Sequence, residues 1–458
     1  MNINVEQDHK GLPHRPDHSY SSAQLLYDDG LHSIFKFLTL GELQSAVCSC
    51  RYWRDAAYSS PCRRESFKFR EENFTTRLTS LVQSTRIKQH ICGVSNIRVT
   101  LDEGHMRLLH QLPRLEEITA WGISPDALHQ AAAAGELNKF FPRTLKYLKL
   151  REIANESYSP ISRILMHIAE AAASLHSVHT LIIQCVLNPL ADVSPLARLK
   201  SLTHLHVHIG WRGGHSQSDR LIDTLSSFPL LKHLHLEGGP ADWSPSAHQL
   251  QRLAQPTHGG PCALHTLNMD KVDLTDSHVR SLCAMPSLTQ LMINRISPVS
   301  LAEIRQLTCV ILEDGKYFLE QLVESTSPAP RSSINTLTLE IPGGYLAPTW
   351  FFSFAHVSAL VYFMPHLQSL TLRLIEWEEA PARVLEALAG ATELKEINFS
   401  LCSGLTLEHF SSLIVCASSL QRVRISSSTC SDWHPYSSSD LLELFYAHLP
   451  RVVIYLHD

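Results

Sequence analysis

The stretch SLTHLHVHI, residues 201–209, decides the fold of this chain because its pattern recurs. It has the form Leu-x-x-Leu-x-Val, with Leu202, Leu205 and Val207 at the apolar positions and histidines between them. The mean period is about 27 residues, and self-similarity of that length is typical of stacked-repeat proteins. Copies of the form start at Val94, Leu115, Leu145, Val178, Leu202, Leu231, Leu264, Leu288, Leu307, Ile334, Leu367, Leu394, Leu420 and Leu449.

The segments between the copies have the periodicity of helices. Residues 218–228, 276–285, 381–391 and 407–417 are examples, and several such segments follow an Asp, Ser or Thr that suits a helix N-cap. One strand and one helix cannot enclose a core alone, whereas stacked copies can bury their leucines against one another. The pattern therefore predicts an α/β solenoid with parallel strands on its concave face; the alternative is an unrelated α/β protein with chance matches.

These copies resemble leucine-rich repeats of the cysteine-containing kind, above all in residues 269–293 and 401–425. The resemblance covers roughly residues 90–458, and we predict residues 94–458 to be a leucine-rich-repeat solenoid of about 14 repeats. It is specific for the fold and says little about function.

Composition excludes several classes of protein. The chain has 458 residues, 44% of them hydrophobic, and a net charge of −5, so composition gives no basic surface for nucleic acid. None of the 11 cysteines forms a Cys-x-x-Cys pair, and most lie in apolar runs, as expected of reduced core thiols. No secretory signal is visible, and the apolar run 349–364 is short for a membrane span. We expect a cytoplasmic or nuclear protein that contacts neither nucleic acid nor membrane, with a disordered tail at 1–22.

Residues 24–69 do not follow the repeat and predict a small helical unit. Leu31, Ile34, Phe35 and Leu38 form one stripe of a first helix, which Gly41 ends. Two further short helices follow before residue 61. A unit of this size makes a poor independent core, so its apolar faces must pack on a neighbour.

This unit resembles an F-box, although Tyr27 stands where that family usually has proline, which weakens the expected adaptor contact at the first turn. The matching positions are Leu26, Asp28, Leu31, Ile34, Phe35, Phe37, Leu38, Leu40, Leu43, Val47, Cys48, Arg51, Trp53 and Arg54. The alternative is a helical cap that covers the first repeat of the solenoid.

The F-box resemblance implies a substrate-recognition subunit of an SCF-type cullin–RING ubiquitin ligase. It implies an SKP-family adaptor as partner, with cullin and RING subunits beyond it, and a protein substrate held by the repeats. Residues 71–93 would be a linker helix and turn between the two parts. The runner-up function is a ligase-independent binding scaffold. The residues expected to contact the adaptor are Leu26, Leu31, Ile34, Phe35, Leu38, Leu40, Leu43, Val47 and Trp53.

The residues that alternate with the buried leucines face outward on the concave side and are the candidates for partner contacts. They form a charge-zoned surface, with histidines in the centre, Glu313 and Glu340 after them, and arginines at the far end. The predicted substrate contacts are Trp121, Tyr147, Lys149, His204, His206, His208, His233, His235, Glu237, Arg373, Arg422 and Arg424. No catalytic motif is present, so we expect neither an enzyme nor a cofactor.

The central histidines leave three interpretations open. His204 aligns with His233 and His206 with His235, on strands about 4.8 Å apart. Imidazoles at that spacing could share a zinc ion with Glu237 as a further ligand, making a metal-dependent activity the third candidate function. A solvated histidine patch is the commoner outcome, and we predict no metal. A partner-binding surface sensitive to pH is the third interpretation.

Overall fold

The structure is a computed structural model, and it describes only part of the chain. The described residues are 65–68, 74–84, 88–89, 91–150, 167–168, 170–171, 175–187, 194–209, 215–238, 245–255, 259–260, 262–325, 331–341, 351–374, 376–377, 383–400, 402, 413, 419–426, 447 and 453–457. The predicted tail at 1–22 and the predicted F-box up to residue 64, with all its expected adaptor contacts, lie outside the described residues.

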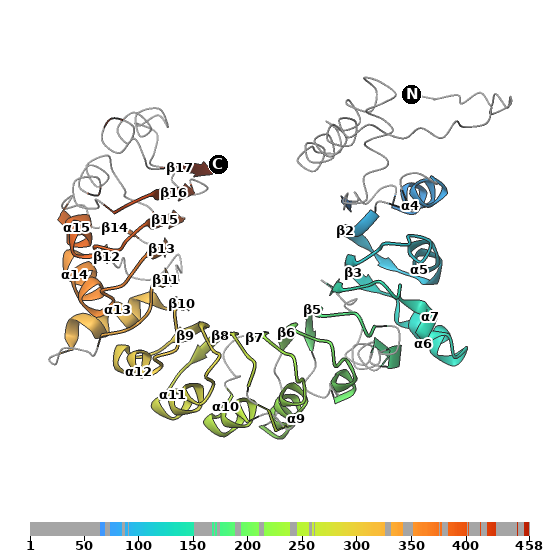
Figure 1. The fold of residues 1–458 in the computed structure, drawn as a ribbon, viewed down its shortest axis with the longest axis horizontal. Helices are drawn as coiled ribbons and strands as arrows, with labels where there is room; N and C mark the ends of the chain where they lie inside the picture. Colours follow the sequence, from blue (N-terminus) through green and yellow to red (C-terminus); the bar gives the residue numbers. More distant parts are fainter. Residues whose placement is uncertain are drawn as a thin grey trace, which may run out of the picture.

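One sheet of 15 parallel strands runs through the described part of the chain, and its spatial order follows the sequence. Figure 1 shows the strands on the inner side of an open arc. The strands are β1 (Glu65–Lys68), β2 (Ile91–Leu101), β3 (Glu117–Ile123), β4 (Tyr147–Leu150), β5 (Thr180–Leu187), β6 (His204–Ile209), β7 (His233–Gly238), β8 (Thr266–Asp273), β9 (Gln290–Arg295), β10 (Cys309–Leu312), β11 (Thr336–Glu340), β13 (Ser369–Arg373), β15 (Glu396–Ser400), β16 (Arg422–Ser426) and β17 (Val453–His457). This is the predicted α/β leucine-rich-repeat solenoid, and the prediction of the fold class is confirmed.

Helices lie on the outer side of the arc (Figure 1). They are α4 (Phe74–Gln83), α5 (Glu103–Leu109), α6 (Pro125–Ala133), α7 (Leu137–Phe140), α9 (His215–Ser226), α10 (Ala247–Ala254), α11 (Asp276–Cys283), α12 (Pro298–Glu303), α13 (Gly315–Glu324), α14 (Phe354–Phe363) and α15 (Arg383–Glu386), with the 3₁₀ turns η3 (Ser194–Arg198) and η4 (Ala387–Gly390). A second, two-stranded sheet pairs β12 (Phe351–Phe352) with β14 (Glu376–Trp377).

The repeat pattern forms the core. From Val94 to Ile425, the apolar positions of every copy are buried, with the exception of the partly buried Val99. Side chains on the strands alternate between this core and the concave surface, as on β8, β11 and β13. Side-chain oxygens of Asp102, Ser124, Ser246, Ser297 and Asp314 accept backbone N–H bonds at the starts of α5, α6, α10, α12 and α13.

A hydroxyl immediately before the first apolar position links neighbouring repeats. Thr144 donates to the carbonyl of Leu115 at 2.6 Å, and Ser201 donates to the carbonyl of Val178 at 2.7 Å. Ser419 makes the equivalent bond to Leu394 at 2.7 Å. Each bond satisfies the carbonyl at the turn that enters a strand, so the stacking register is set by polar as well as apolar contacts.

The boundary between the predicted F-box and the solenoid lies earlier than predicted. Residues 65–68, assigned to the F-box, form β1 and pair in parallel with β2. The predicted linker 71–93 contains α4, whose Phe74, Leu78 and Val82 are buried in the solenoid core. The predicted linker therefore contains the expected helix, and this helix supplies core side chains to the first described repeat.

The first predicted copy of the repeat is also out of register. Val94 pairs with Ile118 and Ile97 with Ala120, and the ladder is irregular between Val94 and Ile97. Val94 therefore occupies the second apolar position rather than the first. The sequence offers two overlapping apolar triplets here, and only the pairing with β3 selects between them.

The apolar run 349–364 and the cysteines have ordinary structural environments. Helix α14 lies within that run and buries Val357, Leu360 and Phe363. No helix among the described residues combines the length and apolar character needed to cross a membrane. Cys262 and Cys402 are buried, as predicted of core cysteines, whereas Cys283 is exposed.

Candidate functional site: the concave face

The predicted substrate contacts fall into three separate groups on the sheet. Trp121 is on β3 and is 39% exposed, and Tyr147 and Lys149 lie half-buried on β4. The histidines and Glu237 lie together on β6 and β7 at the centre. Arg373 on β13 and the pair Arg422 and Arg424 on β16 form the third group. The fold brings the central group into mutual contact.

Four histidines form two stacked pairs, which we call the imidazole cluster: His204, His206, His233 and His235. His204 stacks on His233 with ring centroids 4.0 Å apart and planes inclined by 12°. His206 stacks on His235 at 3.8 Å and 19°. The parallel register of β6 and β7 pairs these same residues, so the strand spacing produces the stacking. His208 is on β6 opposite Glu237, and its side chain is outside the described residues.

The two pairs differ in their hydrogen bonds. His206 Nε2 lies 3.1 Å from Glu237 Oε2, and His235 Nε2 lies 3.1 Å from Asp270 Oδ2. An ionised carboxylate only accepts hydrogen bonds, so Nε2 carries the hydrogen in both rings. His206–His235 is therefore the carboxylate-bound pair.

The other pair binds threonine hydroxyls. His204 Nδ1 is 2.8 Å from Thr203 Oγ1, and His233 Nδ1 is 2.9 Å from Thr266 Oγ1. Both hydroxyls donate elsewhere, Thr203 to the carbonyl of His179 and Thr266 to the side-chain carbonyl of Gln290. They therefore accept from Nδ1–H of the rings. His204–His233 is the hydroxyl-bound pair.

The surroundings favour neutral imidazoles. Burial lowers the pKa of His204, and the charges of His233, His179 and Lys232 lower it further. Burial likewise lowers the pKa of His233, with His265 and Lys232 acting in the same direction. For His206, burial and then the charge of His235 lower the pKa, against the opposing effect of Glu237 and Asp270.

The geometry does not converge on a metal ion. Stacked rings present their nitrogen atoms side by side in parallel planes, and the Nε2 atoms of His206 and His235 point to separate carboxylates. Among the described residues, no group of three or more His, Cys, Asp or Glu side chains is placed to hold a metal ion. The zinc interpretation of the histidine alignment therefore finds no support here.

Carboxylates beside the cluster are functional candidates that the predicted list of contacts left out. Asp270 on β8 binds His235, and Glu313, after β10, accepts the backbone N–H of Lys271 at 2.8 Å. Burial raises the pKa of Glu313, and the nearby Asp270 and Glu340 carboxylates raise it further. Their outward positions in the repeat were the available signal, since each follows the alternation that places the histidines.

At the far end, the predicted arginines are held by carboxylates from neighbouring strands. Arg373 donates to Glu340 at 2.8 Å across β13 and β11. Arg422 and Arg424 both contact Glu396 of β15, at 3.5 and 2.9 Å. These half-exposed ion pairs fix the direction of the guanidinium groups at little gain in stability. Glu396 is a further residue absent from the predicted contacts.

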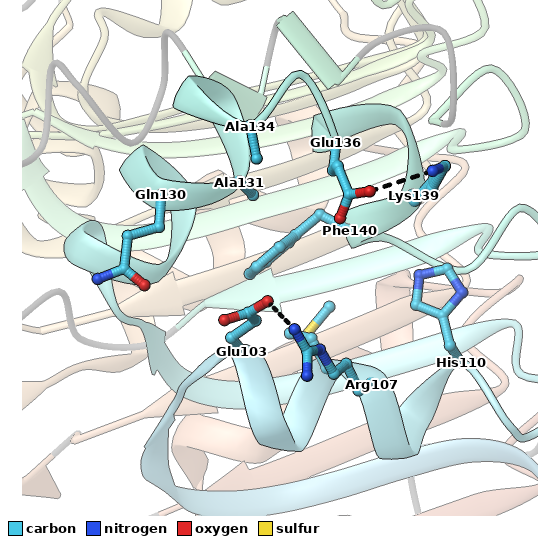
Figure 2. A pocket seen from close by; sticks show the side chains of 10 residues that line it. Glu103, Arg107, His110, Gln130, Ala131, Ala134, Glu136, Lys139 and Phe140 are labelled. Atoms are coloured by element: carbon cyan, nitrogen blue, oxygen red, sulfur yellow. Dashed lines mark hydrogen bonds and ion pairs between the residues drawn. The ribbon is translucent and has the colours of Figure 1, made fainter.

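A pocket of about 360 Å³ lies on the helical side, between α5, α6 and α7. Figure 2 shows Phe140 between Glu103 on one side and Ala131 and Ala134 on the other. The pocket has ion pairs at its rim, Arg107 with Glu103 at 2.6 Å and Lys139 with Glu136 at 3.2 Å. Paired charges thus surround a small apolar floor that includes Ala131, Ala134 and Phe140.

Comparisons with known proteins give similar solved structures but no family. No family model matches the chain, and no curated protein matches it. Among solved structures, it is similar to the Rad7 and Elc1 complex of yeast, with 13% identity and a TM-score of 0.40 over 94% of this chain and 88% of that chain. It is also similar to a leucine-rich-repeat protein of Leptospira interrogans, with 15% identity and a TM-score of 0.36 over 85% of this chain and 99% of that chain. At these values neither match informs on function, and the assignment to the leucine-rich-repeat fold rests on the chain's own repeats and sheet.

Proposed function

We propose that this protein is the substrate-recognition subunit of an SCF-type cullin–RING ubiquitin ligase. Its F-box-like segment binds an SKP-family adaptor, and through it the cullin and RING subunits, in the cytoplasm or nucleus. The concave face of the solenoid holds the target protein. The chain itself is non-catalytic in this proposal, because its role is to bring the target to the ligase.

The observation that carries the proposal is the F-box-like pattern of residues 26–54 directly ahead of the solenoid. Its apolar stripe needs a partner surface, and helix-in-groove docking provides one. The described repeats begin at β1, so few residues separate the pattern from the sheet. A short connection of this kind limits the relative movement of the adaptor and the target.

The concave face supports the second half of the proposal. Its outward side chains are polar and differ in charge along the arc, from Lys149 through the imidazole cluster to Arg422 and Arg424. Arginine, tyrosine and tryptophan are the residue types that most often anchor protein interfaces, and all three occur there. A surface of this composition suits a protein partner.

The test is co-expression of the full chain with an SKP-family adaptor, followed by affinity purification of the adaptor. The double substitution Leu31→Asp/Ile34→Asp places two carboxylates on the apolar stripe, and burying them unpaired is costly. The matched control His32→Asp/Ser33→Asp adds the same charge to the opposite face of the predicted helix. We expect the intact chain and the control variant to co-purify with the adaptor. The Leu31→Asp/Ile34→Asp variant should not co-purify with it.

Failure of the intact chain to co-purify would overturn the proposal. The chain would then be a ligase-independent leucine-rich-repeat scaffold with a helical cap. Circular dichroism and thermal unfolding of the stripe variant show whether its repeats remain folded. They thereby distinguish loss of adaptor binding from unfolding of the whole protein.

A further inference from the structure

We propose that the imidazole cluster is a proton-binding device on the concave face. In mild acid, the carboxylate-bound pair His206–His235 takes up one proton from solvent, while the hydroxyl-bound pair His204–His233 takes up none. An effect of this protonation on target binding rests on the proposed function. The protonation itself does not depend on that function.

Stacking limits each pair to one proton. The ring centroids are 4.0 Å apart in one pair and 3.8 Å in the other, and the rings are nearly parallel. Two imidazolium charges at this separation repel strongly, more so because both rings are partly withdrawn from water. The two rings of a pair therefore titrate as a unit rather than as independent histidines.

Carboxylates distinguish the pair that takes the proton. Glu237 and Asp270 each lie 3.1 Å from an Nε2 atom of that pair. Nε2 already carries a hydrogen, so the added proton goes to Nδ1 of one ring, and the imidazolium remains bound to its carboxylate. The second oxygen of Asp270 is buried and has no hydrogen-bond donor among the described residues. A positive charge next to this carboxylate is thus favoured.

The hydroxyl-bound pair has the opposite surroundings. Its Nδ1 atoms donate to Thr203 and Thr266, so an added proton must go to Nε2, where no carboxylate bond is present in the described structure. His179 and Lys232 oppose a charge on His204, and His265 and Lys232 oppose a charge on His233. The basic neighbours lie near this pair, and the acidic neighbours lie near the other.

Among the described residues, the charged groups that act on the cluster agree with the uptake of one proton. The turns before β5, β7 and β8 contribute His179, Lys232 and His265, while β7 and β8 contribute Glu237 and Asp270. Glu313 lies within electrostatic range of Asp270 and adds negative charge beyond it. In mild acid, the centre of the concave face gains one positive charge among these carboxylates. A target that places a cationic group over β7 and β8 therefore binds more weakly as the pH falls.

The experiment is a histidine titration by NMR on the full chain. Histidine labelled with ¹³C at Cε1 is followed from pH 7.5 to 5.0, and resonances are assigned with His204→Gln, His206→Gln, His233→Gln and His235→Gln. We expect the signals of His206 and His235 to move together in one shared transition. The signals of His204 and His233 should keep their neutral positions over the same interval.

The double variant Glu237→Gln/Asp270→Asn removes both carboxylates and nearly preserves their shape. We expect it to shift the shared transition to lower pH, with thermal unfolding at pH 7.5 showing that the fold is retained. Four independent transitions, protonation of His204–His233 first, or an unchanged transition in the double variant would each overturn the inference. The titration needs no adaptor, so a failure of the proposed function leaves its result intact.

Discussion

Asp314 holds one junction between two repeats, and its substitution gives a quantitative test of the structure. Its side chain is buried and makes two different bonds. Oδ1 accepts the backbone N–H of Tyr317 at 3.1 Å and caps α13, while Oδ2 accepts from Arg295 Nε at 2.6 Å. Asp314→Ala removes both bonds, and Asp314→Asn keeps the cap while it removes the charge.

The two bonds differ in their expected contribution to stability. Loss of an N-cap costs about 1 kcal/mol. A hydrogen bond to a charged group contributes about 1.5–3 kcal/mol when shielded, and we take the lower end because the side chain of Arg295 is 47% exposed. We therefore expect Asp314→Ala to destabilise α13 by about 2–3 kcal/mol and Asp314→Asn by about 1.5 kcal/mol.

Hydrogen exchange followed by mass spectrometry measures this locally, which matters because a long repeat array does not unfold in one step. Exchange of the first-turn amides of α13 should accelerate roughly 30- to 150-fold in Asp314→Ala and about tenfold in Asp314→Asn. Arg295→Gln is the control that leaves the cap intact. Equal acceleration in the alanine and asparagine variants would refute the assignment of separate contributions to the cap and the ion pair.

Three further predictions concern the sheet and its packing. Because burial lowers the pKa of His204 and His233 in the folded chain, the unfolded chain binds more protons below its ordinary histidine pKa, about 6.5. The stability that these neutral histidines permit is thus fully present above that pH, and it falls as the pH drops through it towards the folded pKa values. The melting temperature at pH 5.5 should therefore lie below that at pH 7.5. The difference between the two melting temperatures should be smaller in His204→Gln/His233→Gln. Gly315→Ala should destabilise the chain in urea unfolding although alanine favours helices, because a Cβ there would lie 3.0 Å from the Cβ of Leu339; a gain in stability would contradict this packing. Leu267→Ala, in the fully buried row of the sheet, should destabilise β8 by about 2–5 kcal/mol, measured as faster hydrogen exchange of the β8 amides, and unchanged exchange would mean that this row is not core.

Much of the fold could be predicted because the repeat encodes it locally. A Leu-x-x-Leu-x-Val segment defines a strand, its buried face and its outward residues all at once, and recurrence fixes the order of the strands. Strands β3 to β16 of the main sheet accordingly coincide with predicted copies, whereas β17 is out of register with the last copy, because Ile454 pairs with Val423 and so takes the second apolar position in place of Val452. The prediction failed at the first described repeats, where Phe74, Leu78 and Val82 pack as core without a preceding leucine pattern.

The candidate site could be predicted only in outline. Alternation placed His204 and His233, and His206 and His235, at equivalent positions on adjacent strands. It could not show that the rings stack, since that depends on rotamers and on the spacing of the two strands. Nor could it show which side chains pair across repeats, because partners such as Asp270 lie about one repeat away in sequence.

The sequence by itself thus determined the solenoid, its strand order and the identity of the residues along its concave face, because a period-two pattern within a repeated unit specifies all three. The tertiary structure alone decided the register of β2, the entry of α4 into the core and the division of the histidines into carboxylate-bound and hydroxyl-bound pairs. These depend on contacts between neighbouring repeats, where the choice of partner is set by packing and by the requirement that each buried polar atom be hydrogen-bonded.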